Sequence, residues 1–258
     1  RALSSLISYV EDDENNVSKL LDQVYHRVGN AYRIGITGPP GAGKSTIVDQ
    51  LTKLYRKEDK TVGIIAVDPT SPFTGGALLG DRIRMGDLST DPGVFIRSMA
   101  TRGSLGGLAL RTHEVADLLD AFGFDVVIFE TVGVGQSELD IVEAADSTVV
   151  VLVPESGDSI QAMKAGLMEI ADIFAINKSD REGAERVVLE IQYVLEFSED
   201  SRPWKPAIVQ TIANTGKGID DLKKSLENHL AFQNRHKIRI EKQKKRIEKY
   251  IRQIIKEN

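Results

Sequence analysis

The chain of 258 residues contains no cysteine, few aromatic residues and no long apolar run. The absence of cysteine excludes a disulfide scaffold, a zinc site built on thiolates and a cysteine nucleophile. The longest apolar run, at residues 148–154, has the length of a buried strand and is far shorter than the ~18 residues of a membrane span. No secretory leader is visible, so we expect a cytoplasmic protein without a membrane partner.

The charge is unevenly distributed along the chain. The formal net charge is −5, but residues 234–258 carry ten lysines and arginines against three glutamates, a net of +7 that leaves −12 for the remainder. An acidic body is atypical of nucleic-acid-binding proteins, whose binding face is basic. We therefore expect no nucleic-acid partner. The basic tail could still contact an acidic surface, including the protein's own.

Short runs rich in valine and isoleucine alternate with segments of helical periodicity. Seven runs predict strands, at residues 33–37, 62–67, 94–96, 126–129, 148–153, 173–176 and 207–210. Such a pattern indicates an α/β fold, in which a mostly parallel sheet is covered by helices on both faces. Helical spacing at either end predicts an N-terminal helical extension (1–30) and a C-terminal helix (232–258) around the α/β domain (31–231).

A glycine-rich segment lies between the first predicted strand and the following helix. It reads Gly38-Pro39-Pro40-Gly41-Ala42-Gly43-Lys44-Ser45 and fits the pattern GxxxxGK[ST]. Glycines let consecutive backbone N–H groups surround phosphate oxygens, and the positive end of the next helix faces the same anion. Lys44 brings a charge to the β- and γ-phosphates, and Ser45 offers a hydroxyl to Mg²⁺. We therefore predict a P-loop NTPase with nucleotide contacts from this whole run and from Thr46.

A second motif, NKSD at residues 177–180, follows the strand predicted at 173–176. Asp180 can accept hydrogen bonds from N1–H and the 2-amino group of guanine, and adenine offers neither in that geometry. Lys178 can lie over the purine ring, and Asn177 can tie loops together. The loop after the next strand is expected to contribute Ile212, Ala213 and Asn214, with the Ala213 N–H reaching guanine O6. The motifs favour GTP and GDP as ligands.

Acidic residues at strand ends, or in the loops beyond them, are candidates for a magnesium site. Asp68 and Glu130 end two predicted strands, and Asp81 lies in the long loop between residues 69 and 85. Phosphate-bound Mg²⁺ uses few carboxylates and keeps several waters. The predicted metal-binding set is Ser45, Asp68, Asp81 and Glu130, although Asp68 could only begin a turn and Asp81 could pair with a neighbouring arginine.

The segment after Glu130 bears on hydrolysis. The N–H of Gly133 is placed to sense the γ-phosphate, as in a DxxG loop. Val134 stands where many GTPases carry the glutamine that orients the attacking water, and Gln136 comes two positions later. We therefore predict slow intrinsic GTP hydrolysis. The candidate catalytic residues are Lys44, Glu130, Gly133 and Gln136.

Taken together, these motifs resemble the MeaB/MMAA-type GTPases, which assist adenosylcobalamin-dependent methylmalonyl-CoA mutase and were once described as arginine/ornithine transport kinases. The likeness spans about residues 34–230. Beyond the two motifs above, it rests on VDPTSP (67–72), TGG (74–76), LGDR (79–82), GSLGG (103–107) and ETVGVGQSE (130–138). The last run is far more specific than a phosphate loop alone.

The resemblance implies a GTP-driven chaperone that gates cofactor loading and protects or reactivates the mutase. It also implies a homodimer joined by the C-terminal helical arm. It marks Asp158 and Lys164 as candidates for coupling the nucleotide state to the partner. Ile212 departs from the family, in which related loops often carry serine. Only a side-chain contact is affected, because the backbone meets the base.

The C-terminal helix leaves three roles open. Its apolar residues form a narrow stripe on a cationic helix: Ile240, Ile247, Tyr250, Ile251, Ile254 and Ile255. The resemblance favours a dimer seam. Docking onto the chain's own acidic body is the simplest alternative, and contact with a membrane or nucleic acid is the third.

Two other functions also remain open. A metallochaperone-type GTPase for another metalloenzyme would be expected to carry cysteine or clustered histidine, whereas the four histidines are scattered. A small-molecule or transport-linked kinase would need adenine selectivity, which Asp180 disfavours.

Overall fold

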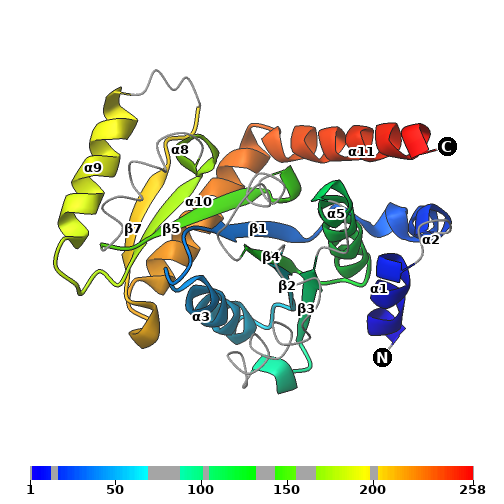
Figure 1. Cartoon of the computed structure of the whole chain (residues 1–258), viewed down its shortest axis with the longest axis horizontal. Coiled ribbons are helices and arrows are strands. Elements are labelled where there is room, and N and C mark those ends of the chain that lie inside the picture. Colours follow the sequence, from blue (N-terminus) through cyan, green and yellow to red (C-terminus); the bar gives the residue numbers. More distant parts are fainter. Residues whose placement is uncertain are drawn as a thin grey trace.

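The computed structural model describes residues 2–12, 17–68, 88–100, 105–131, 143–154, 167–197 and 203–257. They form a seven-stranded sheet in the order β3-β2-β4-β1-β5-β6-β7, in which all neighbouring strands are parallel (Figure 1). The strands are β1 (Tyr32–Thr37), β2 (Val62–Asp68), β3 (Val94–Ala100), β4 (Val126–Thr131), β5 (Ser147–Leu152), β6 (Ile173–Asn177) and β7 (Ala207–Thr211). The predicted parallel sheet is confirmed, and β3 extends beyond its expected end at residue 96.

Alternate side chains of each strand point to opposite faces of the sheet. In β4, Val126 and Ile128 join the hydrophobic core on one face, whereas Val127 and Phe129 join the core on the other. Because both faces are buried, central strands such as β4 and β5 carry apolar residues at successive positions.

Helices cover both faces. On one face lie α3 (Lys44–Lys57) and α10 (Ile219–Arg235). The other face is covered by α1 (Ala2–Asp12), α2 (Val17–Val24), α5 (Leu105–Ala121) and, over β5 and β6, α9 (Ala184–Phe197). Short elements are the 3-10 turns Tyr25–Arg27, Leu88–Thr90 and Ala213–Thr215 and the helix α8 (Leu167–Ile170). The sequence also has helical spacing at residues 159–169, and most of that segment lies outside the described residues. The three-layer α/β fold is as predicted.

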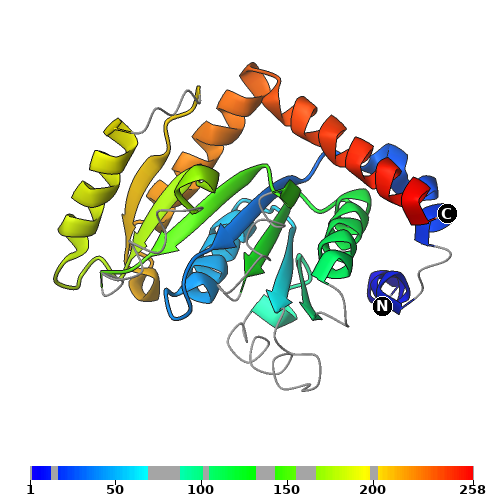
Figure 2. The same ribbon diagram turned by 45° about the horizontal axis from the view of Figure 1, so that its top comes forward.

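The C-terminal helix α11 (Ile238–Glu257) follows a sharp reversal at Lys237, where φ is 60°. Helix α10 ends at Arg235, so it continues past residue 231, where the sequence placed the boundary between the α/β domain and the C-terminal helix. Figure 2 shows α11 turning back from α10 toward the end of the molecule that carries the N-terminal helices.

Polar side chains of α11 dock onto the protein's own body. Arg239 and Arg246 reach the carboxylate of Asp146, at 3.3 and 2.5 Å, just before β5. Five further bonds run to backbone carbonyl oxygens: from Arg239 to residues 30 and 31, from Gln243 to 29, from Lys242 to 146 and from Arg246 to 144. Basic residues of the tail thus contact the same chain, which is the predicted alternative of docking onto the protein's own body.

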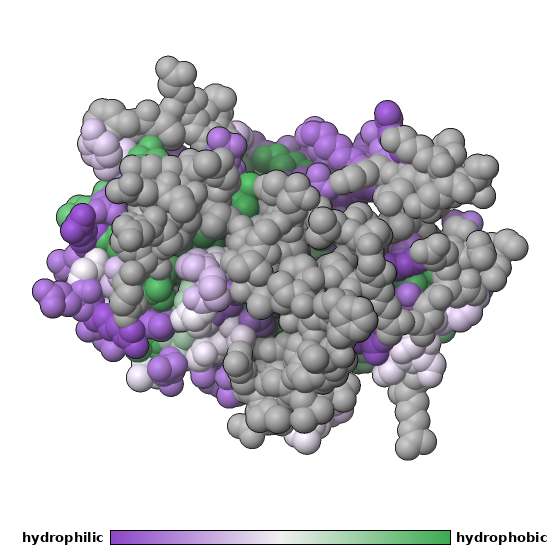
Figure 3. All heavy atoms as spheres, in the orientation of Figure 1, coloured by the Kyte–Doolittle hydropathy of each residue, from purple (hydrophilic) through white to green (hydrophobic). Residues whose placement is uncertain are grey.

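Two of the described apolar side chains of α11 remain on the outside. Ile240 is 51% exposed and Ile251 is 49% exposed, while Ile247 is half-buried. On the face drawn in Figure 3, hydrophobic residues of the described surface appear only as small separate patches among hydrophilic ones. None of the helices in the described ranges is long and apolar enough to cross a membrane.

Candidate functional site

Glycines at three positions shape the loop between β1 and α3. Gly38, Gly41 and Gly43 have φ values of 139°, 75° and 90°, a region that other residues rarely adopt. A Cβ atom at Gly38 would lie 2.2 Å from the carbonyl oxygen of Val151, and one at Gly43 would lie 2.3 Å from Nδ2 of Asn177. The backbone conformation and the close neighbours therefore both require glycine in the motif.

Lys44 opens α3 directly after this loop. Its side chain is buried, and Nζ donates to the carbonyl oxygens of Gly38 and Pro39 at 2.8 and 2.9 Å. Gly43 stands at the N-cap without a side-chain cap, so the first N–H groups of α3 face the loop. The ammonium group and the helix terminus together provide a positive site for a phosphate anion.

The end of β4 lies beside the phosphate loop. In β4, Glu130 points to the face covered by α3, as Ile128 does, and its Oε1 accepts a hydrogen bond from Oγ of Ser45 at 2.5 Å. A carboxylate and a hydroxyl, both oxygen ligands, thus meet at the first turn of α3. This pairing of strand end and loop agrees with the arrangement expected from the sequence.

Asn177, at the end of β6, joins two loops. Its Nδ2 donates to the carbonyl oxygen of Ala42 at 2.8 Å, and its Oδ1 accepts from the Ala213 N–H at 3.1 Å and from Oγ1 of Thr211 at 3.2 Å. The tie between loops was predicted, whereas the partner of Ala213 was not. That N–H points to Asn177 and not toward a free position for guanine O6, so a base could only share it.

The remaining base-contact candidates lie around Asn177. Lys178 has φ of 55° and is half-buried, and Asp180 is exposed, with its carboxylate open to solvent. Ile212 is half-buried and its N–H donates to the carbonyl oxygen of Lys217 at 2.9 Å, while Asn214 is exposed. The parallel strands bring these residues and the phosphate loop to one edge of the sheet, where such folds bind ligands.

Several predicted residues cannot be placed. Asp68 ends β2, and only its backbone is described. The other members of this group lie outside the described residues: Asp81, Gly133, Gln136, Asp158 and Lys164.

Sequence reasoning missed three threonines at strand ends. Thr211 bonds to Asn177, and Thr131 donates to Thr37 at 3.1 Å. Each is the last residue of its strand: Thr37 directly precedes the glycine-rich loop, Thr131 lies within the run ETVGVGQSE, and Thr211 directly precedes Ile212. That position was the available signal.

Comparison with known proteins identifies the family of the chain. Residues 3–258 match the family described as methylmalonyl Co-A mutase-associated GTPase MeaB. The chain belongs to this family. The match to the MeaB family covers the phosphate loop, the loops that follow β6 and β7, and α11.

Relatives of this MeaB-family chain agree. A Pyrococcus abyssi protein, named provisionally as a GTPase, is 55% identical over 258 residues, covering 99% of this chain and 80% of that protein. The GTPase ArgK of Escherichia coli is 40% identical over 211 residues, covering 80% and 63%. The crystal structure of an LAO/AO transport system kinase superposes with a TM-score of 0.81 at 28% identity and covers 99% and 78%. The chain is a GTPase of the MeaB/ArgK family with a P-loop NTPase fold.

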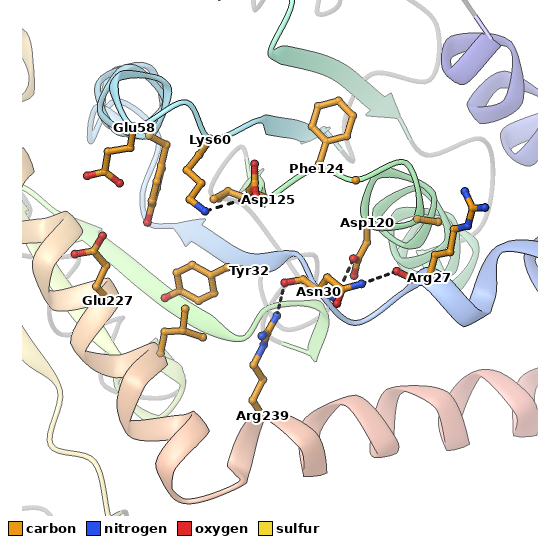
Figure 4. A pocket seen from close by; sticks show the side chains of 15 residues that line it. Arg27, Asn30, Tyr32, Glu58, Lys60, Asp120, Phe124, Asp125, Glu227 and Arg239 are labelled. Atoms are coloured by element: carbon orange, nitrogen blue, oxygen red, sulfur yellow. Dashed lines mark hydrogen bonds and ion pairs between the residues drawn. The ribbon is translucent and has the colours of Figure 1, made fainter.

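A cavity of about 570 Å³ opens at the amino-terminal edge of the sheet, opposite the edge that carries the phosphate loop (Figure 4). Its four lining carboxylates all accept hydrogen bonds or pair with cations of the protein itself. Lys223 bridges Glu58 and Glu227 at 2.7 and 2.5 Å, and Lys60 lies 3.7 Å from Asp125. The fourth, Asp120, accepts backbone N–H groups of residues 29–31. These contacts engage all four carboxylates within the protein itself, so the phosphate loop remains the candidate functional site of this MeaB-family GTPase.

Proposed function

We propose that this GTPase binds GTP at the loop of residues 38–46 and uses its hydrolysis to act as a chaperone of an adenosylcobalamin-dependent methylmalonyl-CoA mutase. The nucleotide half of this proposal is supported above all by the 2.5 Å contact between Ser45 and Glu130 at the base of the glycine loop. The Lys44 ammonium neutralises phosphate charge, and backbone N–H groups of the loop orient the triphosphate.

A magnesium ion fits the residues present. Hydroxyl and carboxylate oxygens are the ligands that Mg²⁺ prefers, and Ser45 and Glu130 supply both. In the described ranges no cluster of three or more histidine or acidic residues could hold a metal by itself. We propose that Ser45 and Glu130 hold Mg²⁺ together with the phosphates, with Asp68 and Asp81 as further acidic candidates. When bound, the ion would offset negative charge that develops on the phosphate oxygens.

Guanine selectivity is assigned to the loop of residues 177–180. Asp180 is solvent-exposed and free to accept from N1–H and the 2-amino group, Lys178 flanks the ring, and Asn177 holds the neighbouring loops at a fixed distance. Loop residues Ile212, Ala213 and Asn214 close the pocket around the purine edge. We assign γ-phosphate sensing to Gly133 and water orientation to Gln136, and expect slow intrinsic turnover.

The client is proposed from the family. The description of the matching family names an association with methylmalonyl Co-A mutase, and the match extends over residues 3–258. GTP hydrolysis would gate cofactor loading or reactivation, Asp158 and Lys164 would couple the nucleotide state to the mutase, and the work would take place in the cytoplasm. We expect GTP turnover to rise at least about fivefold when the mutase from the same source is added. An unrelated cobalamin enzyme is the control, and equal turnover with both proteins would contradict the assignment.

We also propose a homodimer in which α11, with the region after residue 231, is the contact arm. Its polar side chains are used by the chain's own body, whereas Ile240 and Ile251 face outward and can pack on a second copy. Light scattering should give a dimer for the wild type and a monomer for the variant with both residues changed to glutamate. The same change at Leu189 and Tyr193, which are exposed on α9, should leave the dimer intact. A wild type that is monomeric at all concentrations would exclude the arm as a seam.

A further inference from the structure

Two consecutive residues of β4 hold the two ends of the phosphate loop. Glu130 accepts from Ser45, the last residue of the phosphate-loop motif and the second residue of α3, at 2.5 Å. Thr131 donates from Oγ1 to Oγ1 of Thr37, the residue before the loop begins, at 3.1 Å. Because neighbouring strand residues point to opposite faces, one bond lies on the α3 side of the sheet and the other on the α5 side.

The threonine pair is deeply buried. Thr37 is 0% exposed and Thr131 is 1% exposed. Register places Ile36 beside Glu130, so the next residues of the two strands, Thr37 and Thr131, come side by side at the edge of the sheet. In the described part of the chain, each hydroxyl has the other as its side-chain hydrogen-bond partner.

Stability alone does not explain this pair. A buried hydrogen bond contributes little net free energy, and replacing both partners by apolar groups of the same shape can be almost neutral. Valine has the shape of threonine and a higher tendency to occupy buried strands. Two threonines at this position therefore indicate a requirement for the bond itself, at the point where the loop leaves the sheet.

We propose that Thr131 and Thr37 are positioning residues for GTP hydrolysis. The bond fixes the end of β4 against the start of the phosphate loop, so that Glu130 stays opposite Ser45 when the Ser45 hydroxyl serves Mg²⁺ and nucleotide. The same bond anchors the point from which the chain continues to Gly133. The inference rests on the proposed nucleotide site and adds to it two residues that touch neither phosphate nor metal.

The test compares Thr131→Val and Thr37→Val with the serine variants, which keep the hydroxyl. The valine variants should lose about tenfold in kcat for GTP and need more Mg²⁺ for half-maximal rate, because the uncompensated loss of one buried hydrogen bond has this magnitude. GDP affinity should change less than about twofold, and the serine variants should recover most of the rate. The double valine variant should be no slower than either single one, because the three lack the same bond.

A matched control is Thr52→Val in α3, the same chemical change at a fully buried threonine whose hydroxyl has no hydrogen-bond partner among the described residues. Its kcat and melting temperature should be at least those of the wild type. If Thr131→Val does not fold, Thr37→Val tests the same bond from the other side.

Three results would overturn the inference: valine variants with wild-type kcat and Mg²⁺ dependence, serine variants as slow as valine, or a loss of kcat matched by equal losses of GDP affinity and melting temperature. Failure of the proposed site is recognised separately. In that case Lys44→Ala would still bind GTP as the wild type does, whatever the threonine variants do.

Discussion

Asp146 is the residue on which the position of α11 depends most strongly, and Asp146→Asn tests this directly. The carboxylate is 1% exposed and accepts from the Arg33 N–H at 3.1 Å, from Nε of Arg239 at 3.3 Å and from Nη2 of Arg246 at 2.5 Å. Burial alone would raise the pKa of Asp146, but the two arginines of α11 and the N–H of Arg33 outweigh it and leave the pKa below the usual value. The folded protein therefore requires the charged form.

The expected loss follows from these contacts. Asparagine keeps the shape and one acceptor but removes the charge that two largely buried guanidinium groups face, with side-chain exposures of 15% and 13%. Breaking a buried ion pair from one side costs about 3 kcal/mol or more, because the opposite charge stays desolvated. For a chain of this size, about 3 kcal/mol lowers the melting temperature by roughly 6–12 °C. The bonds from α11 to backbone carbonyls remain and limit the effect.

Thermal unfolding followed by circular dichroism at neutral pH measures this loss. The matched control is Glu190→Gln, which removes the same kind of charge from the pair with Arg186, whose side chains are 38% and 83% exposed. That surface pair is worth ~0.5 kcal/mol. When the measurement is repeated in 1 M salt, the loss of melting temperature should shrink by a larger fraction for the control than for Asp146→Asn, because buried pairs are screened less. If Asp146→Asn lowers the melting temperature no more than the control does, the reasoning about α11 is refuted.

Three further predictions concern the loop, the base and pH. Gly43→Ala should weaken GDP binding by at least about tenfold in calorimetry, since its Cβ would meet the Asn177 amide at 2.3 Å and φ is 90°; unchanged affinity would contradict the loop geometry. Asp180→Ala should reduce the preference for GTP over ATP by about a hundredfold or more, and a preserved ratio would remove Asp180 from the base site. Burial lowers the pKa of His229 below its usual 6.5 despite nearby Asp172. On acidification the unfolded chain therefore gains a proton before the folded one does, so urea stability should fall from pH 7 to 5.5, and less steeply in His229→Gln.

Much of the fold could be predicted because local sequence and tertiary structure agree. Buried parallel strands such as β5 read as short continuous apolar runs, and their alternation with segments of helical spacing indicates a parallel sheet. The glycines at 38, 41 and 43 likewise coincide with positive φ values, so the motif reflects a backbone requirement. Polar residues placed after strands could be assigned to one sheet edge, because parallel strands end together.

Other features escaped because they depend on contacts between distant segments. The Ala213 N–H is taken by Asn177, 36 residues away, and no local pattern shows where an N–H will point. The tail was predicted to be amphipathic, but its apolar stripe did not reveal that the polar side would face the body. Asp146 carries no signal in the sequence, and only the folded chain brings Arg239 and Arg246 to it.

The way in which α11 is attached determines which residues of the contact can be substituted without loss of its bonds. Five of its bonds end on main-chain oxygens of residues 29–31, 144 and 146, which every amino acid possesses. These bonds therefore do not depend on which side chains stand at 30, 31 and 144, whereas Gly29 is set by its φ of 113° and Ala31 and Ala144 by their burial. Nearly all the side chains that make these bonds belong to α11. An alanine scan of the contact between α11 and the body should therefore find its sensitive positions on the helix and, on the body, at Asp146.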